Sequence, residues 1–202
     1  SLGRHDAVFF SPVFPSISKS GHRPTLDFRR VAERLARRTS AERRTEVIAL
    51  GGIAPERVAR CADLGFDGVA ALGALWQAPE PVRVFRELCA AAEPWRGALR
   101  GRPVMCITQD GIALPHEEQA ERLCRAGAQW VQVRMKRAGE AERLKTATAV
   151  AALCRVHGAH CIVNDSVEIA LASGADGAHL GRLDGDWAEA RRRLGPGRLL
   201  GG

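Results

Sequence analysis

Short apolar and β-branched runs alternate along the chain with segments whose apolar residues recur at helical spacing. The runs are bounded by Gly, Pro, Asn or Asp, as buried strands usually are. They cover residues 7–10, 46–50, 68–72, 104–108, 130–134, 161–164, 177–180 and 198–200. Because most of these runs are apolar at successive positions, they predict parallel strands that are covered on both faces.

The segments between the runs predict helices. Phe28, Val31 and Leu35 share one helical face, and Pro55 and Pro81 stand where the first turn of a helix would accept them. This alternation predicts an α/β protein, and about eight strands in 202 residues fit a small (β/α)8 TIM barrel. The active site of such a barrel lies at the carboxyl ends of its strands. A doubly wound sheet is the alternative.

Three glycines mark a weak internal repeat. Gly65, Gly127 and Gly174 each stand where a predicted helix must end before the next strand, within segments of similar sequence. Glycine adopts the left-handed conformation of a helix C-terminus at low cost. The repeat therefore supports a chain built from βα units.

The composition, 46% hydrophobic and 26% charged, is that of a globular protein. No apolar stretch reaches the roughly 20 residues of a membrane helix, and residues 1–6 lack the pattern of a signal peptide. We therefore expect a cytoplasmic protein that does not bind membranes. Six cysteines are scattered without a C-x-x-C motif, which favours buried free thiols over a metal or redox site.

The net charge of +7 and the isoelectric point near 9.7 are compatible with nucleic acid, an acidic membrane surface or a polyphosphate ligand. Most basic residues are arginines on predicted helices, without interleaved aromatic residues. The densest group consists of Arg29, Arg30, Arg34, Arg37 and Arg38. We interpret this group as a solvated helix face, and we expect no nucleic-acid partner.

Lysine is rare in this arginine-rich chain, and two of the three lysines follow predicted strands. Lys19 ends a hydroxyl-rich loop that includes Ser16 and Ser18, and such a loop could wrap a phosphate. Gln132, Arg134 and Lys136 alternate along one face of the strand 130–134 and its extension. Three polar groups there indicate anion binding or, alternatively, a structural ion network.

Two carboxylates follow neighbouring predicted strands. Asn164 and Asp165 end the strand 161–164, and Asp184 follows the strand 177–180. Asp165 and Asp184 could share Mg²⁺, which prefers carboxylate, water and phosphate oxygens. Asp165 could instead cap the next helix.

A Gly-Gly pair follows the strand 46–50. Gly51 and Gly52 would let backbone N–H groups approach a ligand closely, and Pro55 begins a helix whose dipole favours an anion.

Taken together, these motifs resemble the thiamine phosphate synthase family over nearly the whole chain. The family's first four strands resemble residues 105–108, 131–136, 162–167 and 174–181, and a following acidic position is matched by Asp184. Its later strands resemble residues 11–19, 47–53 and 65–70. The family's C-terminal half, strands 6–8, thus corresponds to residues 1–93, and its N-terminal half, strands 1–5, to residues 103–202. Residues 94–102 read as a linker.

The resemblance implies a transferase that joins a hydroxymethylpyrimidine diphosphate to a thiazole phosphate and releases pyrophosphate. It implies that Asp165 and Asp184 hold Mg²⁺. The implied ligands of the pyrimidine diphosphate are Gln132, Arg134, Lys136 and Asn164. The implied ligands of the departing pyrophosphate are Ser16, Ser18 and Lys19, and those of the thiazole phosphate are the backbone at Gly51, Gly52, Leu72 and Gly73. Lys19, Arg134 and Lys136 would be the catalytic cations.

The chain departs from the family pattern in several places. Arg182 stands where the family usually has Gln, and Gly73 where it usually has Ser. The order of the halves, with the helix between family strands 5 and 6 largely absent, implies a circularly permuted barrel or one built from two half-barrels. Exposed edges at the gap could lead two copies to exchange halves as a homodimer.

Two other functions remain open on the sequence. One is the related thiazole tautomerase branch, which tends to lack the metal-binding acids. The other is a non-catalytic barrel that binds thiamine precursors or a protein partner.

Overall fold

A computed structural model of the chain describes residues 5–15, 17, 26–93, 104–181 and 183–202. Its eight strands are parallel to their neighbours and follow one another in chain order with the topology of a closed barrel, so the expected TIM barrel class is confirmed. By its internal contacts the chain divides into an N-terminal unit, Ser1–Met105, and a C-terminal unit, Cys106–Gly202.

The strands lie where the apolar runs predict them, to within one residue at each end. They are β1 (Ala7–Phe10), β2 (Glu46–Leu50), β3 (Gly68–Ala71), β4 (Val104–Ile107), β5 (Trp130–Val133), β6 (His160–Asn164), β7 (Gly177–His179) and β8 (Leu199–Gly201). The helices are α1 (Phe28–Ala36), α2 (Val58–Asp63), α3 (Gly73–Trp76), α4 (Pro81–Ala92), α6 (His116–Arg125), α7 (Glu140–Val156), α8 (Val167–Ser173) and α9 (Trp187–Leu194). Short 3₁₀ turns occur at Glu42–Arg44 and Pro55–Arg57.

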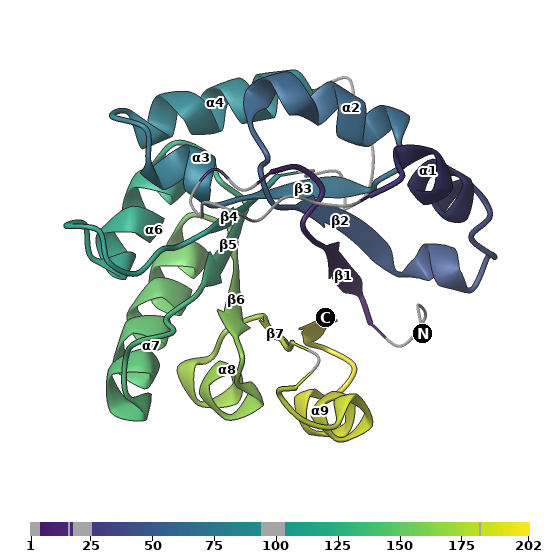
Figure 1. The fold of residues 1–202 in the computed structure, drawn as a ribbon. Coiled ribbons are helices and arrows are strands. Elements are labelled where there is room, and N and C mark those ends of the chain that lie inside the picture. Colours follow the sequence, from purple (N-terminus) through teal and green to yellow (C-terminus); the bar gives the residue numbers. More distant parts are fainter. Residues whose placement is uncertain (1–4, 16, 18–25, 94–103, 182) are drawn as a thin grey trace. The chain divides into compact units, whose positions relative to one another are not determined.

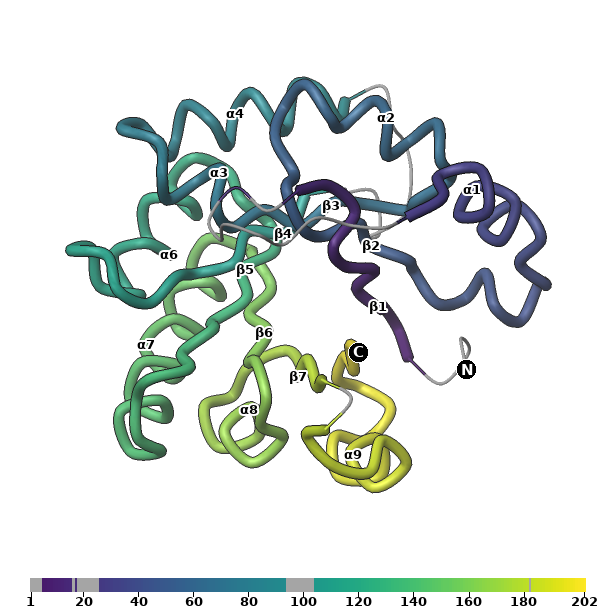
Figure 2. Tube along the Cα trace, in the orientation of Figure 1, coloured from purple at the N-terminus to yellow at the C-terminus, as the bar shows by residue number. Residues whose placement is uncertain are grey.

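In the N-terminal unit, β1, β2 and β3 form a parallel ladder. Ala7 pairs with Glu46, and Ile48 pairs with Gly68. The middle of β2 is fully buried, as expected for a strand that is covered on both faces. In the tube of Figure 2 the chain passes from β2 through α2 to β3, which is the crossover that a parallel pair requires.

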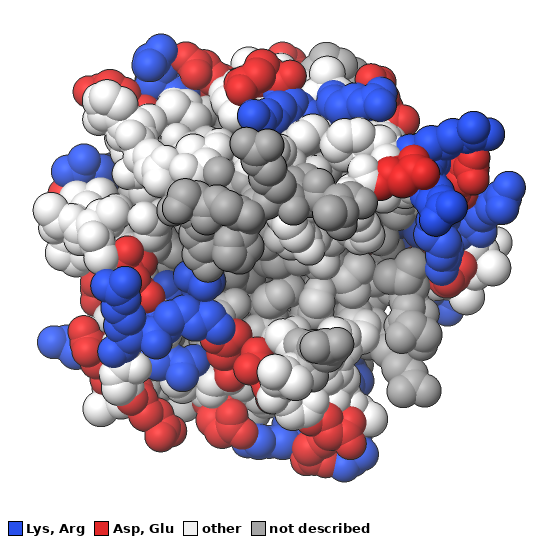
Figure 3. Space-filling model, viewed as in Figure 1, with Lys and Arg blue, Asp and Glu red and all other residues white. Residues whose placement is uncertain are grey.

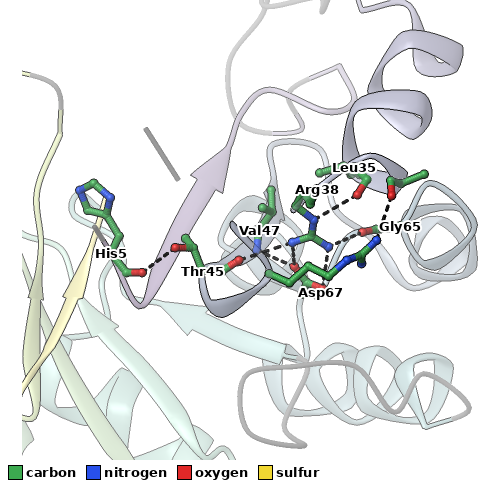
Figure 4. Close-up of polar contacts among 9 residues, drawn as sticks. His5, Leu35, Arg38, Thr45, Val47, Gly65 and Asp67 are labelled. Carbon is green, nitrogen blue, oxygen red and sulfur yellow. Dashed lines mark hydrogen bonds and ion pairs between the residues drawn. The ribbon is translucent and has the colours of Figure 1, made fainter. Parts of the chain in front are cut away.

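One arginine of the predicted solvated face is buried, which corrects that expectation. The guanidinium of Arg38 is 4% exposed and forms an ion pair with Asp67, directly before β3. It also donates hydrogen bonds to the carbonyls of Leu35, Thr45 and Gly65 (Figure 4). The planar donor fork of arginine meets several acceptors at once, so this residue ties α1 to the amino ends of the strands.

The other arginines of that group behave as expected. Arg29, Arg30 and Arg37 are exposed, and Arg34 forms an exposed ion pair with Glu42. On the face shown in Figure 3, Lys and Arg side chains are interspersed with Asp and Glu. The positive net charge therefore does not form a continuous basic surface on that face.

In the C-terminal unit, β4 to β8 pair in parallel, with Trp130 opposite His160 and Ile162 opposite Gly177. Helix α7 packs against both α6 and α8. Figure 1 shows α7, α8 and α9 along the outer side of the strands that they connect. Buried residues such as Leu123 and Val150 fill the layer between helices and strands.

The predicted helix ends are confirmed. Gly65, Gly127 and Gly174 have φ values of 86°, 95° and 71°, which lie in the left-handed region that favours glycine.

The cysteines are free, and all but the half-buried Cys89 are buried. Burial raises the pKa of Cys61 to about 12 and that of Cys89 to about 11. The thiols of Cys61 and Cys89 therefore stay protonated and unreactive at neutral pH, as the scattered pattern predicts. Within the described residues, no helix combines the length and apolar character that a membrane crossing requires.

Candidate active site

The segment that leaves β5 carries three of the predicted site residues. Gln132 lies within the strand and is 1% exposed, Arg134 is half-buried, and Lys136 is exposed. Among the described residues, the Nε2 group of Gln132 has no hydrogen-bond partner. A buried donor without an acceptor is costly, so this amide is suited to a ligand oxygen.

Lys136 reaches across to the end of β6. Its ammonium forms an ion pair with the carboxylate of Asp165, and the two side chains are 46% and 17% exposed. Asp165 has a φ of 65°, which is uncommon for a residue other than glycine, and its N–H donates to the carbonyl of His179 at 2.8 Å. The unusual backbone holds the carboxylate at the strand end rather than in the following helix.

Asp165 is not the cap of that helix, so the capping alternative is wrong. The cap of α8 is Ser166, whose Oγ accepts the N–H of Ile169 at 3.1 Å. Because a neighbouring hydroxyl satisfies the helix end, the Asp165 carboxylate is available to Lys136 and to a ligand.

Asn164 is the last residue of β6 and is 7% exposed. Arg143 of α7 donates from Nη2 to its backbone carbonyl at 3.0 Å, which leaves the side-chain amide out of that contact. Arg143 was not predicted from the sequence because it lies inside a helix, where arginine is ordinarily a surface residue.

Asp184 lies in the exposed loop after β7. Its carboxylate accepts the N–H of Gly181 at 2.6 Å, and its own N–H donates to the carbonyl of Gly181 at 3.1 Å. Since β6 and β7 are paired, Asp165 and Asp184 follow neighbouring strands as expected. Within the described part of the chain, no group of three or more His, Cys, Asp or Glu residues converges as a metal cluster.

Three residues that sequence reasoning missed join this region. Thr108 and Asp110 follow β4, and His116 begins α6. His116 Nδ1 lies 2.7 Å from Thr108 Oγ1, and His116 Nε2 lies 3.1 Å from Asp110 Oδ1. Thr108 stands directly after β4 and Asp110 two residues later, which is close to the signal that identified Asn164 and Asp165.

In the N-terminal unit, Gly51 and Gly52 allow a close approach of the chain to itself. A Cβ on Gly51 would lie 2.8 Å from Pro12 Cα, and a Cβ on Gly52 would lie 2.3 Å from the carbonyl oxygen of Pro15. The two glycines therefore have a packing reason as well as the predicted ligand role. Leu72 directly precedes α3, which begins at Gly73.

The remaining predicted site residues, Ser16, Ser18 and Lys19, lie outside the described residues. Arg182, which departs from the family pattern, and the predicted linker 94–102 are outside as well. The structure thus brings together the C-terminal set, with Lys136 paired to Asp165 beside Asn164 and Arg134 on the same segment as Lys136.

A family model described as thiamine monophosphate synthase matches residues 2–75 and 104–202, well over half of the chain. A thiamine-phosphate synthase of Aromatoleum aromaticum is 55% identical over 83 residues, which are 41% of this chain and 40% of that protein. One of Chromobacterium violaceum is 53% identical over 75 residues, which are 37% of this chain and 36% of that protein. The chain therefore spans less than half the length of either relative.

A solved structure described as a dihydrodipicolinate synthetase from Pseudomonas aeruginosa is similar in fold. It matches 98% of this chain and 64% of its own with a TM-score of 0.51 and 18% identity. At this identity the likeness concerns the barrel fold alone.

Proposed function

Because the chain belongs to the thiamine monophosphate synthase family, we propose that it joins a hydroxymethylpyrimidine diphosphate to a thiazole phosphate and releases pyrophosphate. The observation that carries the proposal is the pairing of Lys136 with Asp165 at the carboxyl ends of β5 and β6. A cation and a carboxylate meet there beside Asn164, at the end of the strands where barrel enzymes bind their substrates.

The C-terminal unit provides the proposed diphosphate site. Lys136 and Arg134 supply positive charge on one short segment, and the unpaired Nε2 of Gln132 supplies a buried donor. The side-chain amide of Asn164 lies at the end of the adjacent strand. Cations and directed donors are the groups that bind phosphate oxygens.

The donor chemistry of this unit fits Mg²⁺. Asp165 and Asp184 offer hard carboxylate oxygens after neighbouring strands, and magnesium in proteins commonly takes one or two carboxylates together with substrate phosphates and water. This preference explains why no cluster of three protein ligands is needed. When bound, the ion would neutralise negative charge on the diphosphate, and Asp165 and Asp184 would hold it.

In the proposed reaction, the C–O bond between the pyrimidine methylene and the diphosphate breaks, and both electrons leave with the pyrophosphate. The thiazole nitrogen then donates its lone pair to the resulting carbon cation, forming the C–N bond of thiamine phosphate. Positive groups fixed around the leaving diphosphate stabilise the charge that develops as the C–O bond breaks. Lys136 and Arg134 would supply this charge from the C-terminal unit.

The resemblance assigns further ligands to the N-terminal unit. The proposed ligands of the departing pyrophosphate are Ser16, Ser18 and Lys19. Backbone groups would hold the thiazole phosphate, at Gly51, Gly52, Leu72 and Gly73. Because both substrates carry phosphate charges that do not cross membranes unaided, we expect the reaction in the cytoplasm.

The order of the halves belongs to the same proposal. We propose that residues 1–93 correspond to the family's C-terminal half and residues 103–202 to its N-terminal half. The family match leaves out residues 76–103, a stretch that contains helix α4 and the proposed linker 94–102. Exchange of halves between two copies would produce a homodimer, which light scattering of the purified chain would detect.

The test is formation of thiamine phosphate from the two substrates with Mg²⁺, with one pyrophosphate released per product. Lys136→Met should remove most of this activity. Pyrophosphate binding without product would indicate a binding barrel, and conversion of a thiazole substrate alone would indicate the tautomerase. Either result would overturn the proposed synthase.

A further inference from the structure

Three side chains in the C-terminal unit connect the loop after β4 to the loop after β5. We call Thr108, Asp110 and His116 the strand-end clamp. The imidazole of His116 bridges the other two, with Nδ1 2.7 Å from Thr108 Oγ1 and Nε2 3.1 Å from Asp110 Oδ1. The same two partners then accept backbone N–H groups from the segment that leaves β5.

These backbone contacts involve the two proposed cationic residues. The N–H of Arg134 donates to Thr108 Oγ1 at 3.1 Å, and the N–H of Lys136 donates to Asp110 Oδ2 at 2.7 Å. Between them, Met135 is buried at 7% exposed. The main chain of this segment is therefore fixed at Arg134 and Lys136, with the side chain of Met135 buried between them, although the segment lies beyond the last residue of β5.

The clamp is buried and its hydrogen bonds are complementary. Thr108 is fully buried, and the side chains of His116 and Asp110 are 11% and 16% exposed. When the Thr108 hydroxyl donates to Nδ1 of His116, its oxygen still accepts the N–H of Arg134, and the Nε2–H group donates to Asp110. Because every polar atom of the clamp then has a partner, each member restricts the others to one geometry.

A buried glutamine holds the loop that carries the clamp. Gln119 of α6 is fully buried, and its Oε1 accepts the N–H of Gln109 at 2.8 Å. Its Nε2 donates to the carbonyls of Gln109 and Leu114 at 2.9 and 2.8 Å. The loop after β4 is thus rigid enough to position its neighbour.

We infer that Thr108, Asp110 and His116 are positioning residues that hold the backbone of Arg134 and Lys136, so that both cations meet a diphosphate. The inference deepens the proposed function and rests on it for the identity of the anion. The clamp itself acts through the main chain, since its side chains bond to the backbone N–H groups of Arg134 and Lys136 and to one another. Cations fixed before binding lose less conformational entropy when the anion arrives.

The sharpest test compares Thr108→Val with Thr108→Ser. Valine keeps the shape of threonine but removes the hydroxyl that serves Arg134 and His116, whereas serine keeps that hydroxyl. With inorganic pyrophosphate and Mg²⁺ as the probe, calorimetry should show a Kd about tenfold higher for Thr108→Val. The Kd of Thr108→Ser should lie close to that of the unaltered protein. The KM for the pyrimidine diphosphate should follow the same order.

A second pair of variants, at His116, keeps the inference testable if the variant at the buried Thr108 fails to fold. His116→Phe keeps a planar ring but removes both bridging contacts, whereas His116→Gln keeps an amide that can donate to Asp110. Glu121→Gln is the matched control, because it breaks only an exposed ion pair with Arg125 on the same helix. Pyrophosphate affinity should fall for His116→Phe, recover in part for His116→Gln and stay unchanged for Glu121→Gln.

Amide hydrogen exchange distinguishes positioning from a purely structural role. The N–H of Lys136 should exchange faster in Thr108→Val and His116→Phe at temperatures where the rest of the C-terminal unit stays protected. A lower melting temperature with unchanged pyrophosphate Kd in these folded variants would overturn the inference. An unaltered protein that makes no thiamine phosphate, combined with the expected affinity changes, would overturn the synthase but support the clamp.

Discussion

Two cation–carboxylate pairs, one in each unit, have opposite surroundings. The Arg38–Asp67 pair lies at the amino end of β3, where the guanidinium is 4% exposed and is also bonded to backbone carbonyls. The Lys136–Asp165 pair lies at the carboxyl end of β6, where the lysine side chain is 46% exposed. The first pair is enclosed by its own chain, whereas the second remains open to a ligand.

The difference follows the general division of a βα barrel, in which the amino ends of the strands maintain the fold and the carboxyl ends carry chemistry. Asp67 also accepts the N–H of Val47 at 2.8 Å, so its carboxylate is part of the strand pairing. In the C-terminal unit, Asp176 accepts the N–H of Cys161 in the same way, also at 2.8 Å and directly before a strand. The carboxylates of Asp67 and Asp176, each directly before a strand, thus accept backbone N–H groups. The carboxylate of Asp165, after β6, is instead paired with the Lys136 side chain.

The largest expected effect comes from removing the guanidinium of the enclosed Arg38–Asp67 pair. Arg38→Met should lower the free energy of unfolding by about 3 kcal/mol, because it removes the guanidinium hydrogen bonds to three carbonyls and leaves the half-buried Asp67 carboxylate without its cation. Arg34→Met is the matched control on the same helix, where loss of the exposed pair with Glu42 should cost much less, because solvent screens it. Urea unfolding of both variants measures the difference, and equal losses would contradict the structural role of Arg38.

Removing the cation of the open pair should affect activity rather than stability. Lys136→Met should reduce kcat/KM for thiamine phosphate formation about 100-fold, since it removes positive charge from the leaving diphosphate. Its melting temperature should stay close to that of the unaltered protein. Lys145→Met, at an exposed position of α7, controls for the loss of one positive charge. The comparison fails if both lysine variants lose activity to the same extent.

A smaller effect distinguishes the metal-binding role proposed for Asp165 from the helix-capping role of Ser166, the next residue in the chain. Asp165→Asn should weaken the Mg²⁺ dependence of pyrophosphate binding with little loss of stability, because asparagine tolerates the left-handed backbone. Ser166→Ala should do the reverse and cost about 1 kcal/mol of stability through the lost helix cap. Calorimetric titrations with and without Mg²⁺ test the first variant, and thermal unfolding tests the second. An unchanged metal dependence in Asp165→Asn would exclude the proposed metal role.

The smallest expected effect concerns the Arg34–Glu42 ion pair on the surface of the N-terminal unit. The backbone N–H of Thr39, followed by the guanidinium of Arg34, lowers the pKa of Glu42 from 4.5 to about 2. Since the folded pKa lies below the unfolded value, this carboxylate stabilises the fold above about pH 4.5, and the contribution is lost as the pH falls towards 2. Glu42→Gln should therefore lower the melting temperature more at pH 6 than at pH 3. Equal shifts at both pH values would count against this linkage.

Much of the fold was predictable because its signals are local. The eight strands lie within one residue of the apolar runs, since strand burial depends on the residues of the strand itself. Of the polar residues at the strand ends, only some were predicted from the sequence. Asn164 and Asp165 were found because polar residues after a strand are conspicuous, whereas Thr108 and Asp110 carry the same signal and were overlooked. His116 offered no signal of its own, because a histidine at the start of a helix has many ordinary roles.

The sequence by itself determined where the strands lie, to within one residue, and that Gly65, Gly127 and Gly174 end helices. These features depend on side chains and backbone angles within a few residues. Only the tertiary structure decided the partners of the charged groups. Arg38 and Asp67 are 29 residues apart in sequence, as are Lys136 and Asp165, yet one pair is enclosed and the other is open. Their surroundings depend on which segments pack over each strand end, and no local pattern encodes that packing.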